Sequence, residues 1–370
     1  MPNPAPKTIR RMRTAYIASG VMLLFSGALL LASRRSAGFS EWYAVHIHPL
    51  LLGTVGRFFS LFPFSVFEVA LYALVLLAAF ALVRFFVLLL SAPRRLGAWA
   101  AKLLGRTVCL FSALLLLFML GAGVNYSRAS FAALSGLEVE GSSTDELLQL
   151  CLLLARDAAM EADNVPREDG AMTLDGFSVR TATQAAVEQL ADSYAFFSAW
   201  SPQAKPVLAS EGMSYLGITG ICSPFTLEAN YNADVPDYMI PFTICHELAH
   251  LQGFMREEEA NFIAYLACRS SDEAILRYSG AAMALNYALN ALAENADAAA
   301  YAEAWAALPQ ALQDDYAAAG LYWEQFQGTV SEASDRMNDA YLKANAQRDG
   351  VKSYGRMVDL LLAEYRDELS

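Results

Sequence analysis

The clearest chemical signature in the chain is the segment Pro241–Gly253, which reads PFTICHELAHLQG and contains the motif HExxH. On a helix, His246 and His250 are four positions apart and therefore lie on one face. Two imidazoles placed in this way can bind one zinc ion at about 2.0–2.1 Å. Glu247 lies beside them, where it can act as general base toward a water molecule. The motif therefore predicts the zinc site of a hydrolase.

A third protein ligand must come from another part of the chain. The only other histidines, His46 and His48, lie in the apolar first third, so the three-histidine pattern of the metzincins is absent. A carboxylate remains, which would give a His₂Glu site with one open position. Three adjacent acids, residues 257–259, begin the next predicted helix at 255–268. Acids at a helix start also interact favourably with the helix dipole, so the run alone does not identify the ligand.

These residues resemble the gluzincin zinc metallopeptidases. In that clan, HExxH is followed on a second helix by a Glu ligand and, four residues later, by an Asp that hydrogen-bonds a metal-binding His. The matching pair here is Glu257 and Asn261. The resemblance implies that Glu257 is the third zinc ligand, with Glu258 as the second choice. Asn261 departs from the pattern, because its amide oxygen can accept the imidazole N–H but carries no charge.

The wider sequence is similar to a bacterial family of multi-pass membrane proteins that have an HExxH motif and no assigned function. Three features carry this similarity: the apolar N-terminal runs, the segment GITGICSPFTLEA at 217–229, and CHELAHLQGFMREEEANFIAYLAC at 245–268. The similarity implies a zinc-peptidase-like fold in a bacterial cytoplasmic membrane, but it implies no substrate.

Charge divides the chain into two predicted regions, a membrane domain at 1–125 and a soluble domain at 126–370. The first holds 12 Lys and Arg against two acids, a net charge of +10, and the second holds 14 basic and 36 acidic groups, a net charge of -22. The acidic domain would repel phosphate, so we expect no nucleic-acid partner. The expected partners are the lipid bilayer and a peptide or protein substrate.

Three apolar runs are long enough to cross a bilayer, and they predict transmembrane helices at about 15–32, 66–83 and 107–124. The stretch 48–64 is apolar but short, and it contains two prolines and two glycines. We interpret this stretch as interfacial or re-entrant. A fourth span there remains an alternative, and it would place the soluble domain on the other side of the membrane.

Lys and Arg predict the orientation. One basic cluster precedes the first run, and a second, formed by Arg94, Arg95, Lys102 and Arg106, lies in the predicted loop before the third run. The positive-inside rule places both clusters in the cytoplasm. Three spans then place the soluble domain outside the cytoplasmic membrane.

The soluble domain is predicted to be α+β, mainly helical with a small sheet. A capping box, Ser143 to Glu146, begins a helix that runs to about residue 163, and a second helix covers 181–200. Glycines and short apolar pieces within 205–229 indicate two or three strands. Strand 214–226 could be an edge strand that pairs with an extended substrate, or an ordinary core hairpin. Further helices are predicted at 273–295, at 297–308 and from about Tyr322.

These observations favour a membrane-anchored zinc peptidase. The flanks of HExxH are polar, so a site buried inside a membrane-spanning helix is disfavoured. Two other functions remain open. The protein could be a non-catalytic or signalling protein that keeps a peptidase-like zinc fold, or a zinc amidase that acts on cell-wall material.

Overall fold

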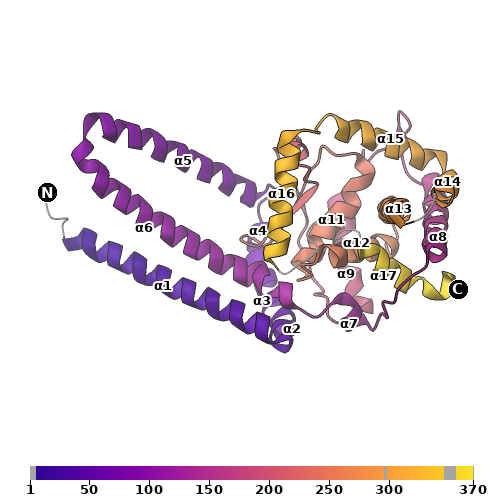
Figure 1. The fold of residues 1–370 in the computed structure, drawn as a ribbon, viewed down its shortest axis with the longest axis horizontal. Coiled ribbons are helices and arrows are strands. Elements are labelled where there is room, and N and C mark those ends of the chain that lie inside the picture. Colours follow the sequence, from indigo (N-terminus) through magenta and orange to yellow (C-terminus); the bar gives the residue numbers. More distant parts are fainter. Residues whose placement is uncertain (1–5, 296–297, 346–355, 370) are drawn as a thin grey trace.

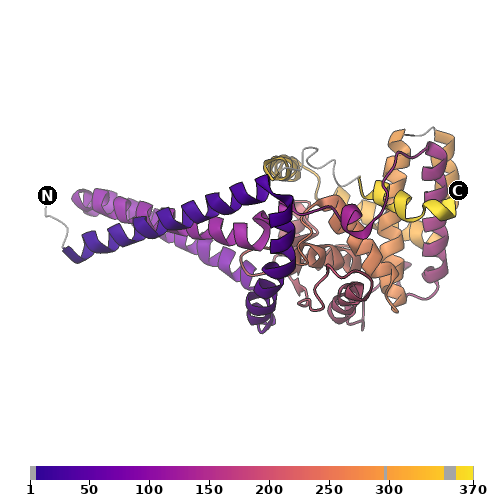
Figure 2. The same ribbon diagram turned by 90° about the horizontal axis from the view of Figure 1, so that it is seen from below.

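The computed structural model describes residues 6–295, 298–345 and 356–369. Figure 1 shows an elongated bundle of three long helices joined to a rounded, mainly helical body. The bundle consists of α1 (Pro6–Arg35), α5 (Val66–Ser91) and α6 (Pro93–Phe118). The view from below in Figure 2 shows the same two parts and places the bundle at one end of the body.

The three predicted spans are confirmed as candidate membrane helices. Stretches long and apolar enough to cross a bilayer cover Arg13–Arg35, Val66–Ser91 and Pro93–Ser127. They extend beyond the predicted 15–32, 66–83 and 107–124, because basic side chains at helix ends can reach the bilayer surface while the helix continues. These helices indicate a membrane protein.

The loop predicted between the second and third spans is wrong. The connection between α5 and α6 is the single residue Ala92, and the basic residues from Arg94 to Arg106 lie within α6. Pro93 occupies the first turn of α6, where its missing N–H costs no helical hydrogen bond. The loop was expected because this stretch is too polar to belong to either apolar run, but the helix continues through it.

The ambiguous stretch at 48–64 belongs to a broken helical segment that begins earlier. It comprises α2 (Ala37–His46), α3 (His48–Leu51), a π-helical turn η1 (Leu52–Gly56) and α4 (Arg57–Ser60). Within the described residues it is not among the candidate spans. Both ribbon views place this segment between the bundle and the body.

The first helices of the body follow the chain after α6, which continues through η2 (Met119–Gly123) and η3 (Asn125–Ser127) into α7 (Phe131–Ser135). Helix α8 (Thr144–Ala162) begins with the predicted capping box, in which Ser143 and Glu146 exchange hydrogen bonds. Helix α9 (Val179–Ser193) ends earlier than predicted, because the chain turns into a loop at Tyr194.

The α+β class is confirmed by two small sheets. Strands β1 (Arg167–Glu168) and β2 (Ala171–Met172) form an antiparallel pair. In the second sheet the order is β3-β5-β4, with β3 (Lys205–Pro206) parallel and β4 (Gly220–Ser223) antiparallel to β5 (Glu228–Tyr231). The two or three strands expected from 205–229 are therefore present, but the short helix α10 (Ser210–Tyr215), which was not predicted, lies between β3 and β4.

The core of the body is built on α11 (Ile240–Leu251), α12 (Glu257–Arg269) and α13 (Ala274–Asn295). Almost every residue of α11 and α12 is buried.

The remaining elements are η4 (Asp237–Met239), α14 (Ala298–Ala306), α15 (Gln310–Glu324), α16 (Thr329–Ala344), α17 (Met357–Glu364) and α18 (Arg366–Leu369). The helix predicted at 297–308 corresponds to α14, although Asp297 lies outside the described residues. The start predicted near Tyr322 is wrong, because Tyr322 lies inside α15.

A buried ion pair joins the sheet to the second span. Lys205 on β3 pairs with Glu228 on β5, and their side chains are only 3% and 2% exposed. The Glu228 carboxylate also accepts the backbone N–H groups of Val66 and Phe67 at the start of α5. A carboxylate at a helix N-terminus satisfies free N–H groups and complements the helix dipole. The sheet therefore fixes the start of this membrane helix.

A second carboxylate makes the reciprocal connection. Glu68, in the first turn of α5, accepts the backbone N–H groups of Leu208 and Ala209, which lead into α10. The membrane helix and the sheet region thus each satisfy backbone groups of the other. Because buried N–H groups without a partner are costly, these bonds favour one relative placement of the two elements.

We expect Glu228→Gln to destabilise the fold by about 3–5 kcal/mol, because it leaves the buried Lys205 ammonium without its counter-charge. Thermal unfolding of the purified protein in detergent would measure the loss. The control is the double variant Lys205→Met/Glu228→Gln, which should be more stable than Glu228→Gln alone. Equal stability of the wild type and Glu228→Gln would contradict the assigned role.

Candidate metal site

Helix α11 presents both motif histidines from consecutive turns of one face. Their ring centroids are 4.6 Å apart, and the ring planes lie at 85° to each other. Pro241 lies in the first turn of this helix. The helix ends before Gly253, whose φ of +88° is a left-handed conformation that favours glycine. The predicted helix and both of its boundary signals are therefore confirmed.

The tight turn at Gly253 brings α12 back across α11. A Cβ atom at Gly253 would lie 3.2 Å from the side-chain nitrogen of Asn125, so the turn is also closely packed. Helix α12 starts at Glu257, only seven residues after His250. The short gap noted in the sequence is thus closed by this one glycine turn.

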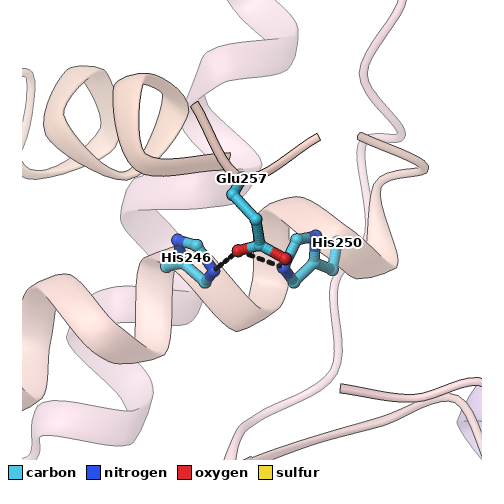
Figure 3. Close-up of side chains that lie close together, drawn as sticks. All are labelled: His246, His250 and Glu257. Carbon is cyan, nitrogen blue, oxygen red and sulfur yellow. Dashed lines mark ion pairs between the residues drawn. The ribbon is translucent and has the colours of Figure 1, made fainter. Parts of the chain in front are cut away.

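Glu257 meets both histidines, as Figure 3 shows. Its Oε2 atom lies 3.2 Å from Nε2 of His246 and 3.6 Å from Nε2 of His250. The three potential ligand atoms all lie within 4.8 Å of one another. Two nitrogens and one carboxylate oxygen therefore converge on one point.

The other two acids of the run are directed elsewhere. Glu259 accepts the backbone N–H of Phe131 at 3.0 Å and pairs with Arg256 at 2.6 Å. Glu258 is half-buried and lies outside the cluster of possible ligands. The structure thus brings Glu257, the first choice, to the histidines, and it leaves Glu258 away from them.

Each histidine is oriented by a hydrogen bond at its second ring nitrogen. Nδ1 of His246 lies 2.7 Å from Oδ1 of Asn261, and Nδ1 of His250 lies 2.7 Å from the carbonyl oxygen of Phe254. Both partners are acceptors, so each Nδ1 donates its proton to them, and each Nε2 is left to bind a metal ion or an added proton. Partners of this kind orient the imidazoles of metal sites. Asn261 therefore occupies the supporting position for which the sequence nominated it.

Burial and charge shift the pKa values of His250 and Glu257. Burial lowers the pKa of His250, but the nearby Glu257 carboxylate outweighs this effect and raises that pKa to about 9. Burial raises the pKa of Glu257, but His250 and His246 outweigh it and hold that pKa well below its usual range. The pocket thus stabilises a carboxylate beside positive charge, which is the environment that a divalent cation would also provide.

The side chain of Glu247 projects from α11 toward the edge strand β4. A Cβ atom at Gly220 would lie 2.5 Å from Oε1 of Glu247, so only glycine allows this close approach. The Cys222 backbone N–H hydrogen-bonds the carboxylate, and burial raises the pKa of Glu247. Only residues 220–223 of the predicted strand 214–226 form a strand. Within the described residues this strand, β4, pairs with β5 alone and so lies at the edge of the sheet.

Two tyrosines near the site were missed by sequence reasoning. The hydroxyl groups of Tyr126 in η3 and Tyr341 in α16 lie 3.0 Å apart. Burial raises the pKa of Tyr341, and the negative charge of Glu257 contributes to the rise. The sequence separation of 215 residues leaves no local signal for this pair.

Three further tyrosines, Tyr231, Tyr278 and Tyr287, lie in the same domain. Tyr278 hydrogen-bonds Asp315 and Arg167 in the core, and Tyr231 lies on β5. Tyr287 is close enough to the site for Glu257 to contribute to its raised pKa, although burial is the larger cause.

The first-third histidines do not join the cluster, and they do not bind one another. Nε2 of His48 lies 2.9 Å from the carbonyl oxygen of Leu251, at the C-terminal end of α11. Nδ1 of His46 contacts the carbonyl oxygen of Trp42 within its own helix. His48 is therefore a structural support for the motif helix.

Residues 43–362 match a family described as "Protein of unknown function (DUF3810)". The chain belongs to this family. The matched range of this DUF3810 protein contains the site residues, the broken segment from Tyr43 onward, and the second and third candidate spans. A search of curated proteins and a search of solved structures gave no match.

We expect Asn261→Ala to weaken metal binding by about 10–100-fold, because His246 loses the partner that orients its ring. Asn261→Asp should bind metal at least as tightly as the wild type, because a carboxylate accepts the same N–H more strongly. Competition with a chromophoric chelator would measure both affinities. Identical affinities for the wild type and Asn261→Ala would contradict this role.

Proposed function

We propose that this protein is a membrane-anchored, zinc-dependent peptidase. The observation that carries the proposal is the convergence of His246, His250 and Glu257 beside Glu247. The gluzincin resemblance supports the same assignment, since Glu257 and Asn261 occupy the positions that the clan pattern gives to the third ligand and its supporting residue.

The donor set fits zinc. Two imidazole nitrogens and one carboxylate oxygen are common ligands of catalytic zinc, which keeps a fourth position open. Both imidazoles direct their Nε2 atoms toward an anionic carboxylate, and a cation bound between them would take the place of the proton that His250 otherwise holds there. When bound, zinc would polarise the scissile carbonyl and increase the acidity of a water molecule.

Glu247 would move the proton. Its carboxylate would accept the proton of the attacking water and then deliver it to the leaving amine nitrogen. Burial raises its pKa toward the working range of a general base, and the Cys222 N–H limits the orientations of the carboxylate. Gly220 and Cys222 thus position Glu247 through close packing and one hydrogen bond.

The edge strand β4 would bind the substrate backbone. Strand addition at a free sheet edge supplies main-chain hydrogen bonds without requiring a particular side-chain sequence. The unpaired edge of β4 runs past Glu247, so a peptide in this position would have its backbone close to the general base. This arrangement favours a peptide over a small ligand as the substrate.

For the orientation, we propose that the domain at 126–370 lies outside the cytoplasmic membrane of a bacterium. The basic residues at the N-terminus and in the first turns of α6 lie at one end of the bundle, and the body lies at the other end. The positive-inside rule then places the body on the extracytoplasmic side.

Glu247→Gln should retain zinc and lose hydrolysis by about 10²–10⁴-fold, because glutamine cannot accept the proton. The assay uses purified protein with a quenched-fluorescent library of random octapeptides, and elemental analysis gives the zinc content. Glu258→Gln is the matched control and should keep full activity.

Full activity of Glu247→Gln would overturn the mechanism. Zinc binding without hydrolysis of any peptide by the wild type would favour a non-catalytic role. Hydrolysis confined to cell-wall fragments would identify an amidase that uses the same residues.

Labelling with a membrane-impermeant maleimide would test the orientation. We expect Gly141→Cys, at an exposed position in the body, to be labelled in intact spheroplasts. Arg94→Cys, at the opposite end of the bundle, should be labelled only after lysis. The reverse pattern would place the body in the cytoplasm and contradict the proposed orientation.

A further inference from the structure

The metal site is built directly against the end of the third span. A Cβ atom at Gly121 would lie 2.1 Å from the carbonyl oxygen of Pro224, in the turn that joins β4 to β5. One helical turn later, Asn125 and Arg128 contact the Gly253 turn between the two ligand-bearing helices. The last turns of this span therefore touch both the edge strand and the turn that places Glu257.

Side-chain packing makes a further connection between the span and the site. Ala122 and Tyr126 form a buried cluster with Met255, which lies two residues before Glu257. Tyr126 also bonds Tyr341, whose pKa responds to the charge of Glu257. The site therefore lies next to the membrane helix, and the two are joined by direct side-chain packing.

The depth of the span places this contact at the bilayer surface. Its apolar stretch begins directly after Arg106 and reaches Val124. Eighteen helical residues span about 27 Å, close to the ~30 Å thickness of the hydrocarbon layer. Because Arg106 marks one boundary, the residues that contact the site lie at or near the other boundary, at the depth of the lipid headgroups.

The broken segment α2–α4 gives an independent indication of the same depth. One side of this segment is buried, and His48 on that side supports the end of α11. The same segment and the turn that follows it also expose large apolar groups, namely Trp42, Val45, Leu50, Phe58, Leu61 and Phe64. Exposed Trp and apolar residues on a segment beside the ends of membrane spans are typical of the membrane interface.

We infer that the substrate is a polypeptide anchored in the same bilayer and cleaved within a few residues of its membrane anchor. This inference rests on the proposed peptidase function. A site at headgroup depth is reached most directly by an extended segment that leaves the bilayer beside it. The edge strand β4 would bind that segment as it emerges, because the turn after β4 rests on the third span.

The test uses purified protein in lipid vesicles with a series of anchored probes. Each probe carries one transmembrane helix, a Gly/Ser linker of 0, 5, 10, 20 or 30 residues, and the quenched random octapeptide library. All probes share one surface concentration, so differences within the series report geometry and not enrichment at the membrane. The same library without an anchor and the Glu247→Gln variant serve as controls.

We expect cleavage with linkers of 0 and 5 residues, at rates at least tenfold above that of the unanchored library. If the site lay high above the bilayer, cleavage would require a minimum linker of about ten residues, since ten extended residues reach about 33 Å. Such a minimum, or equal rates for anchored and unanchored libraries, would overturn the inference while leaving the peptidase function intact. Absence of cleavage in every probe and in the free library would instead overturn the peptidase function.

Discussion

The site depends on one electrostatic constraint, which is the placement of a carboxylate beside the lone pairs of two imidazoles. Asn261 and the Phe254 carbonyl accept the Nδ1 protons, so both Nε2 atoms face Glu257 and are left to bind a metal ion or an added proton. Such a group is stable only with a cation or with added protons. An added proton meets this need for positive charge, which is why the pKa of His250 is raised and the pKa of Glu257 is lowered.

The rest of the core serves to hold these groups together. Gly253 reverses the chain in one turn, so that residue 257 returns to the helix that carries residue 250. Gly220 lets the edge strand approach Glu247 more closely than any other residue would allow. Gly253, just after the end of α11, and Gly220, against the Glu247 side chain, thus place the ligand helix and the edge strand relative to the motif.

Local signals in the sequence predicted much of this arrangement. The HExxH spacing, Pro241 and Gly253 define α11, and the Ser143 capping box defines the start of α8. The three apolar runs predict the spans, because an uncharged stretch of that length has few alternatives. Glu257 was nominated by resemblance, and the structure places it as nominated.

The failures involve contacts that act over long sequence separations. Tyr126 and Tyr341 come together across 215 residues, and His48 reaches Leu251 across 203. The short helix α10 was not predicted, and it overlaps only the first two residues of the strand expected at 214–226. The end of α9 was placed seven residues too late, because its loop residues are apolar and pack into the core.

The support of α11 by His48 and of α5 by Glu228 has a consequence for how the protein can be divided. A fragment that starts at residue 126 would lack His48, whose imidazole contacts the Leu251 carbonyl oxygen. It would also lack the first residues of α5, whose backbone N–H groups bond the Glu228 carboxylate. Buried polar groups on both sides of the cut would then lose their partners. The change of composition near residue 125 therefore marks where the chain leaves the membrane and does not divide it into two units that fold independently. The body needs the membrane helices to satisfy polar groups in its own core.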